Sequence, residues 1–142
     1  MIRYAEEKDE QQIRRLIEIL EEQETFPADA FHHVFSSQLA SKKYLCLVEE
    51  EENGIRGMLN LHFEEQLHHV LPVAQIMEFS VDPQYRSMGI GTALFEEAER
   101  IARDKGCERI ELETSTWRKK AHSFYERMGM KPDHYYFTKD LK

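Results

Sequence analysis

A strand that leads through a glycine loop into a helix constrains the fold more than any other part of this sequence. Apolar, β-branched and aromatic residues predict a strand over Val73–Val81, which Pro83 ends. The loop Arg86–Thr92 follows, and its residues Gly89 and Gly91 lie where a helix is expected to begin. Glycine allows close backbone approach to a ligand, and the free N–H groups of a helix N-terminus favour anions. The pattern predicts a pyrophosphate-binding loop, although a tight turn that needs glycine only for packing would give the same pattern.

Length and charge limit the class of protein. A chain of 142 residues with 41% apolar content is expected to form one domain, residues 1–142, with its own core. A net charge of −8 argues against nucleic acid or an anionic membrane as partner, and no apolar run has the length of a membrane span. We expect a cytoplasmic protein in which Cys46 and Cys107 stay reduced and buried.

Hydrophobic periodicity predicts alternating helices and strands around a mixed sheet. Helices are predicted over Asp9–Glu22, Ala28–Leu39, Ile90–Lys105 and Lys119–Met128. Strands are predicted over Ile2–Ala5, Tyr44–Glu49, Ile55–Phe63, Val73–Val81, Arg109–Thr114 and His134–Leu141. Asn53-Gly54 is a hairpin signal, and strand alternation places Ile55, Gly57, Leu59, Leu61 and Phe63 on one face and Arg56, Met58, Asn60 and His62 on the other.

Two motifs resemble those of the GNAT superfamily of N-acetyltransferases. The first is Arg86-x-x-Gly89-x-Gly91, and the second is the segment from Ala121 to Met130, which contains Phe124, Tyr125 and Gly129 and has Met130 for the usual phenylalanine. The resemblance implies an α/β (α+β) fold. Its central sheet is mixed and largely antiparallel, with helices on both faces and a splayed parallel pair formed by Val73–Val81 and Arg109–Thr114.

The resemblance also implies acetyl-CoA as cosubstrate, with its pyrophosphate at the glycine loop and its pantetheine arm along the first strand of the splayed pair. The residues expected to contact the cofactor are Phe79, Ser80, Val81, Arg86, Ser87, Met88, Gly89, Ile90, Gly91, Thr92, Arg118 and Phe124. Arg118 stands where many relatives have asparagine. It is expected to hold either cofactor phosphates or an anionic substrate, although a basic run such as Arg118-Lys119-Lys120 is usually solvated surface.

Two side chains are candidates for acid–base chemistry. Tyr125 matches the family tyrosine, and a phenol that stays protonated at neutral pH can donate a proton to the departing thiolate. Glu78 is the candidate base. It lies in an apolar strand, where a charged side chain is costly unless it is paired or in contact with water. The alternatives are a core aromatic for Tyr125 and a structural ion pair for Glu78.

Short matches around His62, His68, His69 and His122 resemble the aminoalkylphosphonate N-acetyltransferase branch. That resemblance implies a small amine acceptor with a phosphonate and a divalent metal, although no histidine pair has zinc-finger spacing. Polyamines, aminoglycosides and protein N-termini stay open as acceptors, and a non-catalytic acyl-CoA sensor on the same fold is the alternative to an enzyme. A homodimer is expected, because a short closing strand would leave a sheet edge to cover.

Overall fold

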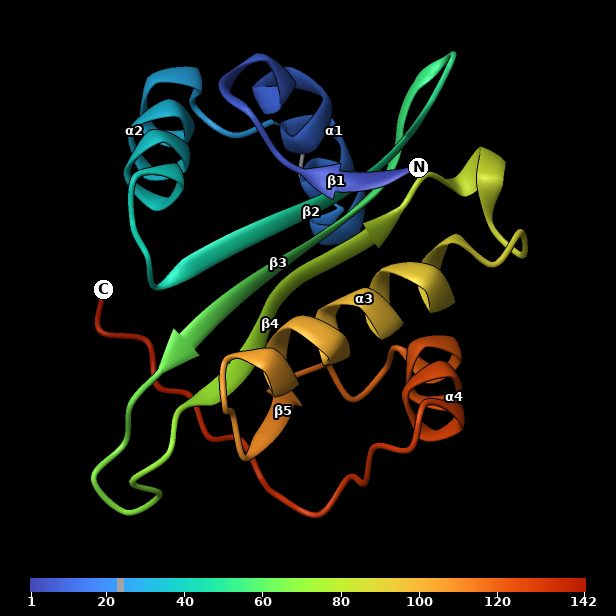
Figure 1. Cartoon of the computed structure of the whole chain (residues 1–142). Helices are drawn as coiled ribbons and strands as arrows, with labels where there is room; N and C mark the ends of the chain where they lie inside the picture. The colour runs from blue at the N-terminus through green and yellow to red at the C-terminus, as the bar shows by residue number, and fades with distance from the viewer. Residues whose placement is uncertain (23–24) are drawn as a thin grey trace. The chain divides into compact units, whose positions relative to one another are not determined.

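The computed structural model describes residues 1–22 and 25–142, which form two compact units, Met1–Glu111 and Leu112–Lys142. A five-stranded sheet organises the first unit (Figure 1). Its strands, in order across the sheet, are β1 (Ile2–Tyr4), β2 (Tyr44–Glu51), β3 (Gly54–Glu64), β4 (Val73–Val81) and β5 (Arg109–Leu112). Strands β1 to β4 are antiparallel, and β4 and β5 are parallel, which confirms the predicted mixed, largely antiparallel sheet.

Helices cover both faces of this sheet (Figure 1). The helices α1 (Glu10–Glu21) and α2 (Ala28–Leu39) pack on one face, and α3 (Ile90–Asp104) packs on the other. The short 3₁₀ helices η1 (Glu7–Asp9) and η2 (Pro83–Tyr85) precede α1 and the glycine loop. Contacts of Ser80 in β4 and of Gly57 in β3 show which helix lies on which face of the sheet. The Ser80 hydroxyl donates to the Leu16 carbonyl of α1 at 2.9 Å, and a Cβ at Gly57 would lie 3.0 Å from Ile90 of α3.

The apolar spacing of the helices explains this arrangement. Residues Ile13 and Leu16 of α1 are buried, as are Leu94 and Ala98 of α3, so each helix presents one apolar stripe to the sheet. Removing such side chains from water is the main stabilising contribution to a core of this kind. None of the helices in the described ranges has both the length and the apolar character needed to cross a membrane.

A β-bulge in β4 directs the candidate base and Ile76 to opposite faces of the sheet. Asn60 of β3 pairs with Glu78, but the next residue, Leu61, pairs with Ile76, so Met77 is an extra residue in β4. Successive side chains of a strand point to opposite faces of the sheet. One inserted residue therefore reverses the face to which each later side chain would point in regular alternation. Ile76 therefore projects toward α3, while Glu78 projects toward α1 and α2.

A second bulge corrects one prediction for β3. Glu49 pairs with Gly57 and Glu50 pairs with Ile55, so Arg56 is the extra residue here. Ile55 belongs to the core cluster on the α1 side, whereas Gly57 faces α3. The prediction that Ile55 shares the face of Gly57 is wrong, because regular alternation does not hold across a bulge.

The second unit contains α4 (Lys119–Arg127), which ends before Gly129 with its positive φ of 91°. The predicted strand over His134–Leu141 is wrong, since the residues after α4 have no helix or strand. Tyr135 and Phe137 are 92% and 90% exposed. The aromatic pattern expresses β-propensity, but a strand forms only where a neighbour completes its backbone hydrogen bonds.

Candidate active site

Glu78 belongs to a short polar network, centred on Asn60, on the α1–α2 side of the sheet. Nδ2 of Asn60 donates to Oε1 of Glu78 at 2.8 Å and to Oε1 of Gln38 at 3.0 Å, so it links β3, β4 and α2. Burial raises the pKa of the Glu78 carboxyl, the Asn60 hydrogen bond opposes that rise, and the charge of Glu21 adds to it. A carboxyl whose pKa is shifted toward neutrality is a better general base than an exposed one.

This network opens on a cavity of about 560 Å³. The cavity is lined by residues of α1, α2, β2, β3 and β4, and Glu78, Asn60 and Gln38 are among them. Most of the other lining residues are apolar or aromatic. Pockets of this size, with a few polar groups in mainly apolar walls, are typical of small-molecule sites.

Alternate residues of β4 near Glu78 direct their backbone N–H and C=O groups away from β3. The Asp82 N–H donates to the Arg56 carbonyl at 2.7 Å, so Asp82 and Arg56 form a hydrogen-bonded pair of the antiparallel ladder. Such pairs alternate with pairs that do not exchange hydrogen bonds. Val81 and Phe79 therefore direct their N–H and C=O groups toward the β5 side, where the pantetheine arm is predicted to bind.

The glycine loop follows directly. Gly89 caps α3 in the left-handed conformation, with φ of 81°, and Ser87 has φ of 66°. Arg86, Ser87 and Met88 are exposed, and Arg86 Nε donates to the Val81 carbonyl at 3.4 Å. Because the first turn of a helix leaves its N–H groups without intrahelical partners, the loop and α3 together provide backbone donors for an anion.

An ion pair holds the start of this loop against α1. Asp82 is buried, Arg15 Nη2 contacts its Oδ2 at 2.6 Å, and the Gln84 N–H donates to its Oδ1 at 3.0 Å. Burial raises the pKa of Asp82, but the hydrogen bonds from Arg15 and Gln84 and the charges of Arg15 and Arg86 together lower it by more, so the net pKa is below its usual value. The loop is thereby fixed to α1 by a charge-assisted contact.

The second unit carries the other predicted residues. Phe124 and Tyr125 pack edge to face with ring centroids 5.7 Å apart, and Arg118 lies over the Trp117 ring at 4.7 Å. Burial raises the pKa of the Tyr125 phenol, against an opposing effect of Arg118. A phenol in this state is protonated at neutral pH, as a proton donor must be.

The histidines do not gather into a metal site. Rings of His68 and His69 lie 4.3 Å apart, but His69 pairs with Glu108, and His62 stacks on Tyr44 at 4.6 Å. Among the described residues, no group of three or more His, Cys, Asp or Glu side chains is placed to hold a metal ion. Within residues 1–22 and 25–142, the implied divalent metal therefore has no fitting donor set.

Sequence reasoning did not identify Asn60, Gln38 and Arg15 as parts of the site. Asn60 gave the same signal as Glu78, since it is a polar residue inside an apolar strand. Its pairing with Glu78 is set by the register of β3 against β4, which the sequence pattern does not show. Gln38 and Arg15 lie on predicted helices, where polar residues are expected on the solvent side.

Comparison with known proteins gives consistent matches. The acetyltransferase (GNAT) family profile matches residues 11–130. An aminoalkylphosphonate N-acetyltransferase of Salmonella typhimurium is 34% identical over 99% of this chain and 90% of its own length. Among solved structures, a transcriptional regulator of Bacillus halodurans has a TM-score of 0.91 and 26% identity over 99% of both chains. An acetyltransferase of Trypanosoma brucei has a TM-score of 0.84 and 26% identity over 99% of both chains.

Proposed function

The chain belongs to the acetyltransferase (GNAT) family, and from this premise we propose that it transfers the acetyl group of acetyl-CoA directly to a small primary amine. Glu78 is the base in this proposal, and Tyr125 is the acid. The observation that carries the proposal is the Glu78 carboxyl, whose pKa is raised and which lines a small-molecule cavity beside the backbone predicted to hold the pantetheine arm.

The reaction balances in one addition and one elimination. Glu78, directly or through a water, takes a proton from the ammonium form of the acceptor, and the nitrogen lone pair then attacks the acetyl carbonyl carbon. A backbone N–H of Phe79 or Val81 stabilises the oxyanion. The carbon–sulfur bond breaks as the carbonyl re-forms, and the Tyr125 phenol gives its proton to the CoA thiolate. The cationic nitrogen of the adduct loses its second proton, which restores the phenol, so one proton stays on the amide nitrogen and one on Glu78.

Glu78→Gln is expected to change the pH dependence of kcat/KM. With a raised pKa, Glu78 is deprotonated, and so active as a base, only above that pKa, where the wild-type profile should level off. In the variant, only the neutral amine attacks, so the profile should keep rising toward the pKa of the amine, which is about 10. The measurement is thiol release from acetyl-CoA across pH, with Glu96→Gln on the exposed surface of α3 as control.

Glutamine keeps an oxygen that can accept from Asn60, so this variant tests the charge rather than the fold. A Glu78→Gln profile identical to the wild type would remove the base assignment. CoA binding without thiol release for any amine would instead favour the acyl-CoA sensor.

Gly89→Val is expected to weaken CoA binding at least about tenfold, or roughly 1.4 kcal/mol. A β-branched side chain is strained at positive φ and would cover donors that should face the pyrophosphate. Gly106→Val is the matched control, because Gly106 also has positive φ, of 76°, and a Cβ at either position meets nothing within 4 Å. Calorimetry in which both variants bind CoA as the wild type does would contradict the assignment of the loop.

An aminoalkylphosphonate is a second candidate acceptor, and the relative with 34% identity favours it. Such a substrate needs a cation opposite its phosphonate, and Arg118 is the residue nominated for that role. If Arg118→Ala loses activity toward 2-aminoethylphosphonate but not toward amines that lack an anionic group, this candidate is supported.

A further inference from the structure

The cavity beside Glu78 has apolar walls. Ile17 of α1, Phe31 and Phe35 of α2, and Met58 of β3 line it, in a volume of about 560 Å³. Tyr44 and Leu45 of β2 are further lining residues. A charged or strongly hydrated group placed against such walls would lose its hydration without gaining partners.

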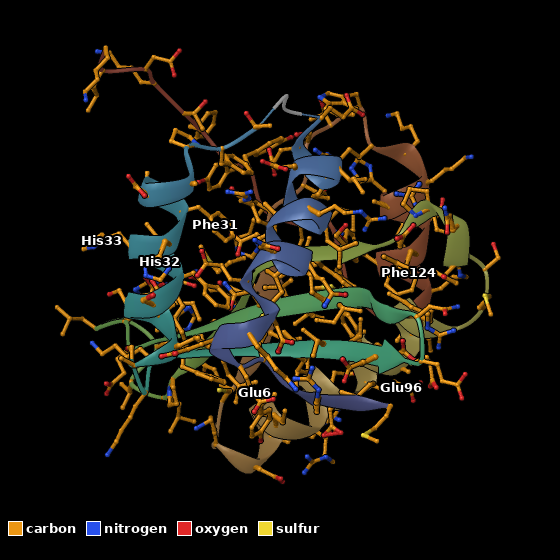
Figure 2. All side chains as sticks on the ribbon, turned by 90° about the horizontal axis from the view of Figure 1, so that it is seen from above. Glu6, Phe31, His32, His33, Glu96 and Phe124 are labelled. Atoms are coloured by element: carbon orange, nitrogen blue, oxygen red, sulfur yellow. The ribbon has the colours of Figure 1, made fainter. Side chains whose placement is uncertain are left out.

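Aromatic rings form one side of this cavity. Phe26, Phe31 and Phe35 stack in a row, with centroids 6.1 Å apart in both pairs and ring planes within 25° of each other. Figure 2 shows Phe31 on the side of α2 that faces α1, and His33 on the opposite side. Stacked rings offer a flat apolar surface that suits another aromatic ring or an alkyl chain.

Among the described residues, the cavity wall has an acidic side chain but no basic one. Of the lining residues in the described part of the chain, Glu78 is the one acidic side chain, and none is Lys, Arg or His. Asn60 and Gln38, which stand beside it, contribute neutral amides. A carboxylate at the edge of an apolar space favours a ligand with one cationic end and an uncharged body. A phosphonate in the same space would lie near that carboxylate, and the described residues of the cavity walls offer no cation to balance its charge.

We propose that this cavity takes a primary amine with an aryl or alkyl body, whose ammonium lies at Glu78 and whose body lies along Phe31 and Phe35. This inference rests on the proposed function and names its acceptor class. The volume lies within the ~300–1,000 Å³ that is typical of small-molecule pockets, so an arylalkylamine fits and a bare short amine would leave most of the space unfilled.

The test compares kcat/KM for 2-phenylethylamine, ethylamine and 2-aminoethylphosphonate, with acetyl-CoA saturating. Burial of the phenyl ring should raise kcat/KM for 2-phenylethylamine at least about tenfold over ethylamine. We expect 2-aminoethylphosphonate to be the poorest of the three, because its anionic end would lie in the apolar walls.

Phe31→Ala should remove most of the preference for 2-phenylethylamine over ethylamine while leaving ethylamine turnover nearly unchanged. His33→Ala is the matched control on the same helix, and its preference should equal that of the wild type. The ratio of the two amines is the readout, because a general loss of folded protein lowers both rates together and does not move it.

The outcomes separate this inference from the proposed function. Turnover with no preference for 2-phenylethylamine, or with 2-aminoethylphosphonate as the best substrate, leaves an acetyltransferase and overturns the cavity assignment. If no amine is acetylated, calorimetric titration with 2-phenylethylamine tests whether the cavity binds this amine. Binding that Phe31→Ala weakens and His33→Ala does not would uphold the cavity assignment while the proposed function falls, and absence of binding would overturn both.

Discussion

Tyr125→Phe is expected to lower kcat by about 10²-fold, with little change in the KM for acetyl-CoA. The phenol is needed when the thiolate departs, and phenylalanine keeps the ring that packs against Phe124. Because burial raises the pKa of Tyr125, its proton is present throughout the neutral range. Steady-state thiol release at saturating amine measures the effect.

A donor with a better leaving group sharpens this test. An aryl thioacetate releases a thiol of lower pKa, which needs no proton on departure, so the wild type and Tyr125→Phe should differ far less with it. Tyr135→Phe removes a phenol from a side chain that is 92% exposed and should leave kcat unchanged. Full turnover of Tyr125→Phe with acetyl-CoA, with chemistry rate-limiting, would make Tyr125 a packing residue.

Asp9→Ala is expected to lower the free energy of unfolding by about 3 kcal/mol, because it leaves a largely buried guanidinium without its main partner. Arg3 holds Asp9 through two contacts, Nη1 to Oδ2 at 2.8 Å and Nη2 to Oδ1 at 2.9 Å. The Asp9 side chain is only 2% exposed, and it also accepts from the Glu6 N–H. Urea unfolding near neutral pH measures the loss.

The pH dependence of this loss follows from the pKa of Asp9, which Arg3 lowers. A folded-state pKa below the unfolded value of about 3.9 stabilises the protein above that value, and the contribution is lost as pH falls through the folded pKa. The difference between wild type and Asp9→Ala should therefore shrink in strong acid. Asp104→Asn breaks the exposed pair with Arg100 and should cost at most about 0.5 kcal/mol. Equal losses for both variants would contradict the argument from burial.

The sequence predicted the regular elements of the first unit well, because their signals are local. The spacing of apolar residues sufficed for α2 and β4, whose predicted bounds, Ala28–Leu39 and Val73–Val81, match the structure. The signal for the hairpin, Asn53-Gly54, is also local, and Glu51 pairs with Gly54 at this turn. Predictions failed where a β-bulge interrupts regular alternation, as in the facing of Ile55, and where no neighbouring strand completes a ladder, as over His134–Leu141.

The candidate site was predictable only in part. Glu78 could be nominated because a charge is unusual in an apolar strand, and the glycine loop could be nominated by its motif. Both roles stay predictions. The cavity and the link from Asn60 to Gln38 come from packing between α2 and the sheet, which no local pattern encodes. The contacts of the bound cofactor with Arg86 and Arg118 stay predictions.

The extra residue at Met77 makes the spacing of β4 matter as much as its composition. Ile76 and Glu78 are two positions apart, yet the bulge sends them to opposite faces. Loss of Met77 would make the pairs Asn60–Glu78 and Leu61–Ile76 consecutive in regular alternation, so the carboxylate would keep its side. Loss of the bulge at constant strand length would instead shift the register of one end of β4 by one residue and turn that end over. Sequence drift in this strand should therefore tolerate loss of the bulge together with one residue more readily than loss of the bulge at constant length.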